Sequence, residues 1–146
     1  MHVLRRSYEA LVPNGTMLDL QVIRPHPRAE TVDGRLLCEA DGDPLFEYAD
    51  AAREAVDLFV RERLLDEEAV DDHDVMQHYS TGAELVEDWE PKKRTLPAEA
   101  LPLLRAFERE CVVRERCRLR LLRRLNLPAN TGLQHQRCAS FVGLRE

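Results

Sequence analysis

Aromatic residues, glycine and long apolar runs are all scarce in this sequence. Aromatic residues make up 5% of its 146 residues, so a core must come mainly from leucine, valine and alanine. No apolar run approaches the roughly 20 residues of a membrane-spanning helix. The N-terminus also lacks the apolar segment and cleavage pattern of a secretory signal. These absences predict one cytoplasmic domain without a membrane partner.

Cysteine motifs are lacking as well. The four cysteines are widely spaced and no C-x-x-C pair occurs, which argues against a zinc ribbon or a redox motif. In a cytosolic chain, reduced thiols are the expectation. The cysteines are Cys38, Cys111, Cys117 and Cys138.

Charge is unevenly distributed along the chain. The net charge is −6, yet residues 30–90 hold 20 acidic and 4 basic side chains, whereas residues 91–125 hold 4 acidic and 11 basic ones. The basic stretch could bind nucleic acid. We favour the alternative, in which the acidic and basic blocks face each other or water within one fold.

Hydrophobic periodicity and turn residues predict alternating helices and strands. The capping pattern Thr81-Gly82-Ala83-Glu84 marks the start of one helix. A short strand at 35–40 could pair back as a hairpin with Leu45 and Phe46. The other expected elements are helices over 2–11, 48–64, 81–89 and 97–107, a buried strand over 16–25, an extended stretch over 67–79 and a strand over 111–124.

Strict alternation makes the strand over 111–124 the clearest of these elements. One face carries Cys111, Val113 and Cys117, and we expect it to point into the core. The other face carries a row of arginines, which we expect to point outward. These arginines are Arg114, Arg116, Arg118 and Arg120.

The N-terminal region supports a family resemblance. A helix ending in Leu11-Val12-Pro13-Asn14-Gly15 leads directly into the strand that starts at Thr16. This resembles the helix, L-x-P-G-G, strand unit of class I S-adenosylmethionine-dependent methyltransferases. The proline stops the helix and the glycine permits a positive φ, while Asn14 replaces a glycine and tolerates the left-handed region.

The resemblance covers about residues 3–124 and implies an α/β fold. The expected fold is a small mixed sheet of about three strands, with an antiparallel terminal pair and flanking helices. The arginine-rich strand would lie between strand 16–24 and strand 67–79. Residues 1–125 would form the domain, and residues 126–146 a loosely ordered tail.

The cofactor-binding half of that family has no counterpart here. No G-x-G motif occurs, and the strands that would carry the glycine-rich loop are absent. We therefore expect no cofactor for this chain alone, and S-adenosylmethionine only if the missing half is supplied. The chain is predicted to be a methyltransferase-like fragment that is inactive alone. The alternative is a small α/β protein-interaction module that pairs through an exposed sheet edge.

Candidate substrate residues lie in the stretch Asp71-Asp72-His73-Asp74…His78-Tyr79. A metal interpretation lacks a standard ligand spacing, so we expect no metal site. The resemblance places this stretch on the substrate side of the sheet. His73, His78 and Tyr79 could then shape a pocket or act as a base.

Strand 16–24 would have lost its parallel neighbour. An apolar strand left at a sheet edge tends to pair with another chain. The resemblance therefore implies a homodimer or a complex with a partner chain through strand 16–24, or else marginal stability.

Overall fold

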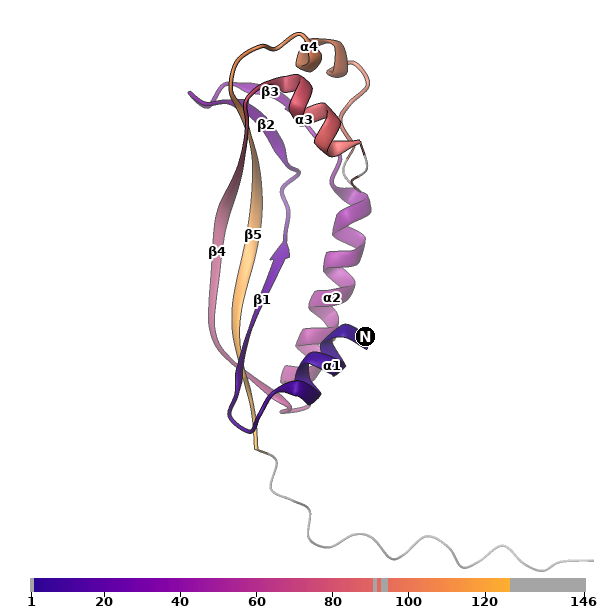
Figure 1. The fold of residues 1–146 in the computed structure, drawn as a ribbon. Helices are drawn as coiled ribbons and strands as arrows, with labels where there is room; N and C mark the ends of the chain where they lie inside the picture. The colour runs from indigo at the N-terminus through magenta and orange to yellow at the C-terminus, as the bar shows by residue number, and fades with distance from the viewer. Residues whose placement is uncertain (1, 91, 93–94, 127–146) are drawn as a thin grey trace, which may run out of the picture.

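The computed structural model describes residues 2–90, 92 and 95–126 (Figure 1). Four helices accompany five strands in this described part of the chain. In chain order the elements are α1 (His2–Ala10), β1 (Thr16–Val22), β2 (Arg28–Thr31), β3 (Leu36–Glu39), α2 (Asp43–Arg61), β4 (Leu65–Tyr79), α3 (Gly82–Trp89), α4 (Leu101–Arg105) and β5 (Cys111–Arg124).

The last strand, β5, is the centre of the sheet. One of its edges pairs with β4 along the whole strand, from Cys111 opposite Tyr79 to Arg124 opposite Leu65. Its other edge is shared by β1 and β2, which follow one another along it. Strand β3 continues the sheet beyond β2. All of these pairings are antiparallel, so β1 and β4 run parallel to each other on either side of β5.

The structure confirms the α/β class, the flanking helices and the position of strand 111–124 between strands 16–24 and 67–79. Strand β2 was not expected, and the sheet has five strands rather than about three. The stretch 36–39 forms β3, but it pairs with β2 rather than with Leu45 and Phe46. Those two residues belong to α2, which already begins at Asp43 with Pro44 in its first turn. Proline suits this position because its missing N–H has no partner within the helix.

The turn between α1 and β1 depends on two neighbouring residues in different ways. Asn14 has a φ of 60°, so the left-handed residue is the asparagine rather than the glycine. Gly15 is needed for space, since a Cβ there would lie 2.8 Å from the carbonyl oxygen of Val12. Its N–H donates a 2.8 Å hydrogen bond to that same oxygen. The chain therefore reverses tightly and enters β1.

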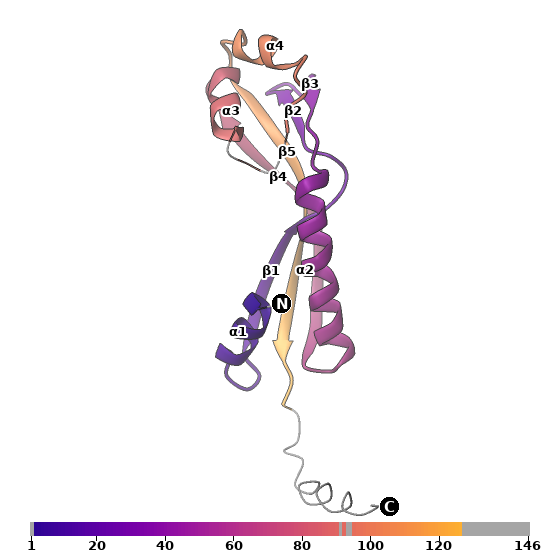
Figure 2. The same ribbon diagram turned by 90° about the vertical axis from the view of Figure 1, so that its right-hand side faces the viewer.

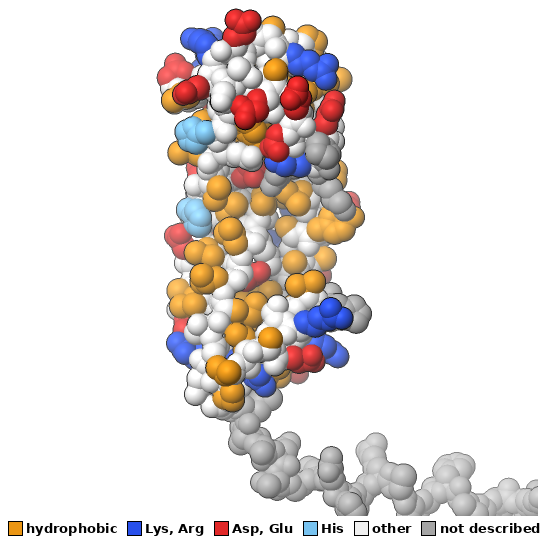
Figure 3. Space-filling model, in the orientation of Figure 1, with side chains coloured by type: hydrophobic (Ala, Val, Ile, Leu, Met, Phe, Trp, Pro, Cys, Tyr) orange, Lys and Arg blue, Asp and Glu red, His pale blue; other side chains and the backbone are white. Residues whose placement is uncertain are grey.

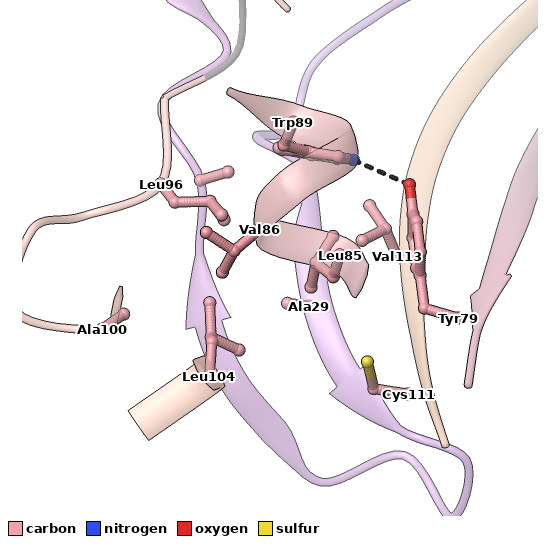
Figure 4. Packing of buried hydrophobic residues seen from close by; sticks show 11 residues of the cluster. Ala29, Tyr79, Leu85, Val86, Trp89, Leu96, Ala100, Leu104, Cys111 and Val113 are labelled. Carbon is pink, nitrogen blue, oxygen red and sulfur yellow. Dashed lines mark hydrogen bonds between the residues drawn. The ribbon is translucent and has the colours of Figure 1, made fainter. Parts of the chain in front are cut away.

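The two pairs of helices pack at different ends of the long, twisted strands, α3 and α4 at one end and α1 and α2 toward the other (Figures 1 and 2). The helices α3 and α4 pack at one end of the face that carries Cys111 and Val113 (Figure 4). The helices α1 and α2 lie on the opposite face, where Leu122 of β5 is fully buried against Val56 and Phe59 of α2. Because side chains alternate along β5, this one strand contributes to both cores.

The start of α3 has the cap that the sequence predicts. Thr81 Oγ1 accepts a 3.2 Å hydrogen bond from the N–H of Glu84. The Glu84 carboxylate in turn accepts one of 2.8 Å from the N–H of Ser80. Reciprocal bonds of this kind satisfy N–H groups that have no partner inside the helix.

The predicted tail over 126–146 falls, except for Asn126, outside the described residues. Within the part of the chain that is described, no helix combines the length and apolar character that crossing a membrane requires.

Two adjacent leucines of α4 provide a matched test of the α3–α4 core. Leu104 is fully buried against α3, whereas Leu103 is exposed. We expect Leu104→Ala to lower the free energy of unfolding by about 2–5 kcal/mol, because it leaves a cavity. Leu103→Ala should change it by less than about 0.5 kcal/mol. Urea denaturation of both variants measures the difference, and equal losses would contradict this placement of α4.

Candidate functional site

The three residues predicted to face a substrate do not form one site. His73 and Tyr79 lie on one face of β4 and His78 lies on the other, as the alternation of a strand requires. His73 Nδ1 lies 2.8 Å from a carboxylate oxygen of Asp71, at an exposed position. Six residues of strand separate His73 from Tyr79, which corresponds to about 20 Å. Their role at a substrate stays a prediction, and the geometry does not bring them together.

Tyr79 belongs to a hydrogen-bond network beneath α3. Its hydroxyl donates to Asp88 Oδ2 at 2.6 Å. It also accepts a 2.9 Å hydrogen bond from Trp89 Nε1 (Figure 4). Burial, and then the hydrogen bond to Asp88, raise the pKa of Tyr79. The bond from Lys92, followed by that from Tyr79, lowers the pKa of Asp88. A neutral phenol held between two partners anchors α3 on the sheet and is poorly suited to act as a base.

The arginine row of β5 corrects another expectation. It lies on the face that α2 covers in part, where Arg120 is only 6% exposed, whereas the side chains of Arg114, Arg116 and Arg118 are 36–38% exposed. Arg120 pairs with Asp57 of α2 and with Glu67 of β4. Arg118 makes a bidentate pair with Asp72, with N–O distances of 2.7 and 2.8 Å.

The rest of the row is paired as well. Arg116 contacts Asp74 at 3.0 Å, and Arg114 contacts Glu30 at 3.1 Å and Asp74 at 3.4 Å. The acidic block of the sequence therefore neutralises the basic one across the sheet. Guanidinium groups that are already paired with carboxylates are less able to bind a phosphate backbone, so nucleic-acid binding remains a weak candidate.

One small group of side chains has the composition of a cation site. Ligand atoms of His26, Asp41 and Asp43 lie within 4.8 Å of one another at the start of α2. However, Arg24 lies 3.8 Å from Asp43, and the N-terminus of a helix carries partial positive charge. His26 Nδ1 also accepts a 3.0 Å hydrogen bond from the N–H of Gly42. These contacts give the three side chains a structural role in the turn before α2, and we assign no metal to them.

The outer edge of β1 is an open strand edge with little charge. Strand β1 ends the sheet and pairs only with β5. The outer edge of β4 is also open, but that strand carries six acidic residues, which discourage pairing with another strand. In β1, Asp19 is the one charged residue of TMLDLQV. The β1 edge thus lacks the charge that protects the β4 edge.

Backbone hydrogen bonds show which N–H and C=O groups of β1 point away from β5. Arg124 N–H donates to the carbonyl oxygen of Gly15, and Ile23 N–H donates to that of Arg116, each at 2.8 Å. Odd-numbered residues of β1 therefore point their N–H and C=O groups toward β5. The N–H and C=O groups of Leu18 and Leu20 consequently point outward, along the open edge.

An apolar surface adjoins this edge on one face of the sheet. Leu18 is 67% exposed and Leu20 is 58% exposed. They lie opposite Leu121 and Leu119 of β5, which are only half-buried. The helices α3 and α4 contact the other end of this face and leave these leucines uncovered. Exposed leucines that adjoin an open strand edge are typical of an interaction site.

A groove adjoins the same edge on the opposite face. It has a volume of about 770 Å³ and lies between α1, β1 and α2. Val3 and Ser7 of α1 form one wall, and the small residues Ala51, Ala52 and Ala55 of α2 form the other. Figure 3 views the molecule from the side of β1 and shows hydrophobic side chains over the middle of this face, with acidic ones gathered at its upper end. The strand edge, the exposed leucines and this groove together form the β1 surface.

Sequence reasoning identified the strand of the β1 surface but not its groove. The groove depends on the small side chains of Ala51, Ala52 and Ala55, which the sequence analysis did not single out. The available signal was the run of small residues, because alanines leave space beside a neighbouring strand.

Comparisons with protein-family models, with curated proteins and with solved structures each found no match to this chain.

The arginine row predicts a specific acid sensitivity. Hydrogen bonds from Arg118 and from Arg116 hold the pKa values of Asp72 and Asp74 below their ordinary value of 3.8. A carboxylate with a lowered folded pKa stabilises the fold above its unfolded pKa, and this stability is lost as pH falls through the folded pKa. We therefore expect the free energy of unfolding to fall as pH drops below about 3.8.

The double variant Asp72→Asn/Asp74→Asn should be less stable than the parent at pH 7 and should lose less stability on acidification. Denaturant titrations at both pH values measure this. A matched control, Glu9→Gln/Glu62→Gln, removes two exposed carboxylates outside the row and should keep the parent acid response. An unchanged acid response in the Asp72/Asp74 variant would show that the row does not stabilise the fold.

Proposed function

We propose that this chain is an interaction module that associates through the β1 surface by adding a β-strand alongside β1. The observation that carries the proposal is the open backbone edge at Leu18 and Leu20, flanked on one face by their own exposed side chains and on the other by the groove. Strand addition of this kind gains affinity from main-chain hydrogen bonds and specificity from side-chain pockets.

Simple energetics favour an occupied edge. Full burial of one exposed leucine side chain stabilises a complex by about 1.5–3 kcal/mol. The outward N–H and C=O groups of Leu18 and Leu20 would also exchange water for protein partners, each bond contributing about 0.5–1.5 kcal/mol. Neither leucine is needed for the cores of the isolated chain, so their apolar character is best explained by a partner.

Site-specific photocrosslinking in cells tests this function. A photoreactive phenylalanine analogue at Leu20 should give a discrete covalent adduct, because a partner strand lies against this position. The control position is Val32, which has the same 58% exposure but lies beyond β2, away from the β1 surface. Adducts of equal yield from both positions, or none from Leu20, would contradict the proposal.

The strand order favours a second candidate function, that of a methyltransferase-like half-domain. The antiparallel last strand lies between two strands that run parallel to each other, as the resemblance to class I S-adenosylmethionine-dependent methyltransferases implies. In this case the partner at the β1 edge would carry the cofactor-binding strands and a glycine-rich loop. A Leu20 adduct with such a chain would support this candidate over a general interaction module.

Cofactor binding gives a direct test of the half-domain. We expect no heat and no thermal shift when the purified chain is titrated with S-adenosylmethionine or S-adenosylhomocysteine, because it has no glycine-rich loop to approach the ligand. Binding should appear only after a partner that carries such a loop is added. Micromolar binding by the chain alone would overturn this account and would make substrate screening the next step.

A further inference from the structure

We propose that the partner strand is β1 of a second copy of this chain, paired antiparallel so that Leu20 lies opposite Leu20 of the other copy. This inference rests on the proposed function, since it names the occupant of the β1 surface. A two-fold axis perpendicular to the sheet would join the two sheets into one continuous sheet.

The backbone of β1 allows this pairing directly. The outward N–H and C=O groups belong to the even-numbered residues, so two copies centred on Leu20 meet with matching groups. Leu20 would pair with Leu20, and Leu18 would pair with Val22, both through main-chain hydrogen bonds. On this face every cross-strand contact between the two copies is apolar.

Side chains on the other face favour the same register. Centring the pair on Leu20 places Asp19 opposite Gln21 of the other copy, twice in each dimer. The Gln21 amide already donates a 2.9 Å hydrogen bond to Asp19 within one strand, so these two groups are chemically matched. Centring on Asp19 instead would place two carboxylates directly opposite each other, which is destabilising.

The helices complement each other in shape and charge. Within one copy, α1 packs near Met17 and Phe59, and it leaves the part of the groove beside Tyr48, Ala51 and Ala52 uncovered. The antiparallel arrangement would bring α1 of the second copy to this part.

The charges beside the groove agree with this placement. Helix α1 carries exposed Arg5 and Arg6, whereas α2 carries exposed Glu47 and Glu54 on the turns that flank Ala51. Opposite charges would therefore meet between the helices of the two copies, and the remaining apolar wall would be covered.

Disulfide trapping tests the register. With Cys138→Ser as the background, Leu20→Cys should form a covalent dimer under mild oxidation, because the Cα atoms of a hydrogen-bonded antiparallel pair lie about 5.5 Å apart. Leu18→Cys alone should not, since the two copies of residue 18 would be about 13 Å apart. The double variant Leu18→Cys/Val22→Cys should crosslink again. Equal crosslinking by Leu18→Cys and Leu20→Cys would overturn the register.

Sedimentation equilibrium tests the dimer itself. The parent chain and Val32→Lys should dimerise, and Leu20→Lys should be monomeric while keeping the parent circular dichroism spectrum. Gln21→Glu should weaken the dimer by roughly 2- to 30-fold, because two carboxylate pairs would then face each other. Its folded monomer should be retained, because residue 21 faces Arg118 within the same copy.

Different results would overturn the dimer and the interaction module. A parent chain that is monomeric at all concentrations, combined with a Leu20 photoadduct to a different protein, would overturn the second copy as partner and leave the interaction module standing. A monomer that also gives no Leu20 adduct would overturn both.

Discussion

The pairing of β5 on both of its edges is the constraint on which the rest of the structure depends. This last strand bonds to β4 along its full length and to β1 and β2 in succession. The strands β1, β2 and β4 are therefore joined into one sheet only when β5 is in place. Its two faces supply both cores, with Leu122 on one and Cys111 and Val113 on the other. The position of β5 also leaves the far edge of β1 open.

The same strand explains the segregation of charge along the sequence. A row of arginines on the face beneath α2 is tolerated because β4 and α2 place carboxylates against it, as in the pairs of Arg118 with Asp72 and of Arg120 with Asp57. Partly buried charges need such partners. The acidic middle of the sequence and its basic late stretch thus pair with each other across the sheet, between the two apolar cores.

The sequence allowed some elements to be predicted well, for local physical reasons. Strict alternation placed β5 at 111–124, and the Thr81 cap placed the start of α3. What the sequence did not reveal is non-local. Strand β2 is four residues long and exists because it pairs with β5 more than 80 residues later. The arginine face was assigned to solvent because charge is normally exposed, and only the register with β4 shows its partners.

The candidate site likewise combines features that the sequence indicated with features that only the fold reveals. The apolar pattern of strand 16–24 could be inferred from the residues, whereas the expectation of an open edge came from the family resemblance. His73, His78 and Tyr79 were grouped by proximity in sequence, but strand alternation separates them, and Tyr79 is committed to Asp88 and Trp89. The groove against α2 needs the relative placement of two helices and a strand, which no single segment encodes.

The central claim is that the backbone edge of β1 is open in one copy and occupied in the complex. Residue-resolved amide hydrogen exchange measures this directly, because adjacent residues of the strand act as internal controls. In dilute protein the account predicts rapid exchange at Leu18 and Leu20 and slow exchange at Asp19 and Gln21, whose N–H groups bond to β5. In concentrated protein all four amides should exchange slowly. Leu18 and Leu20 amides that exchange equally fast at every concentration, in protein that nevertheless dimerises, would contradict the account.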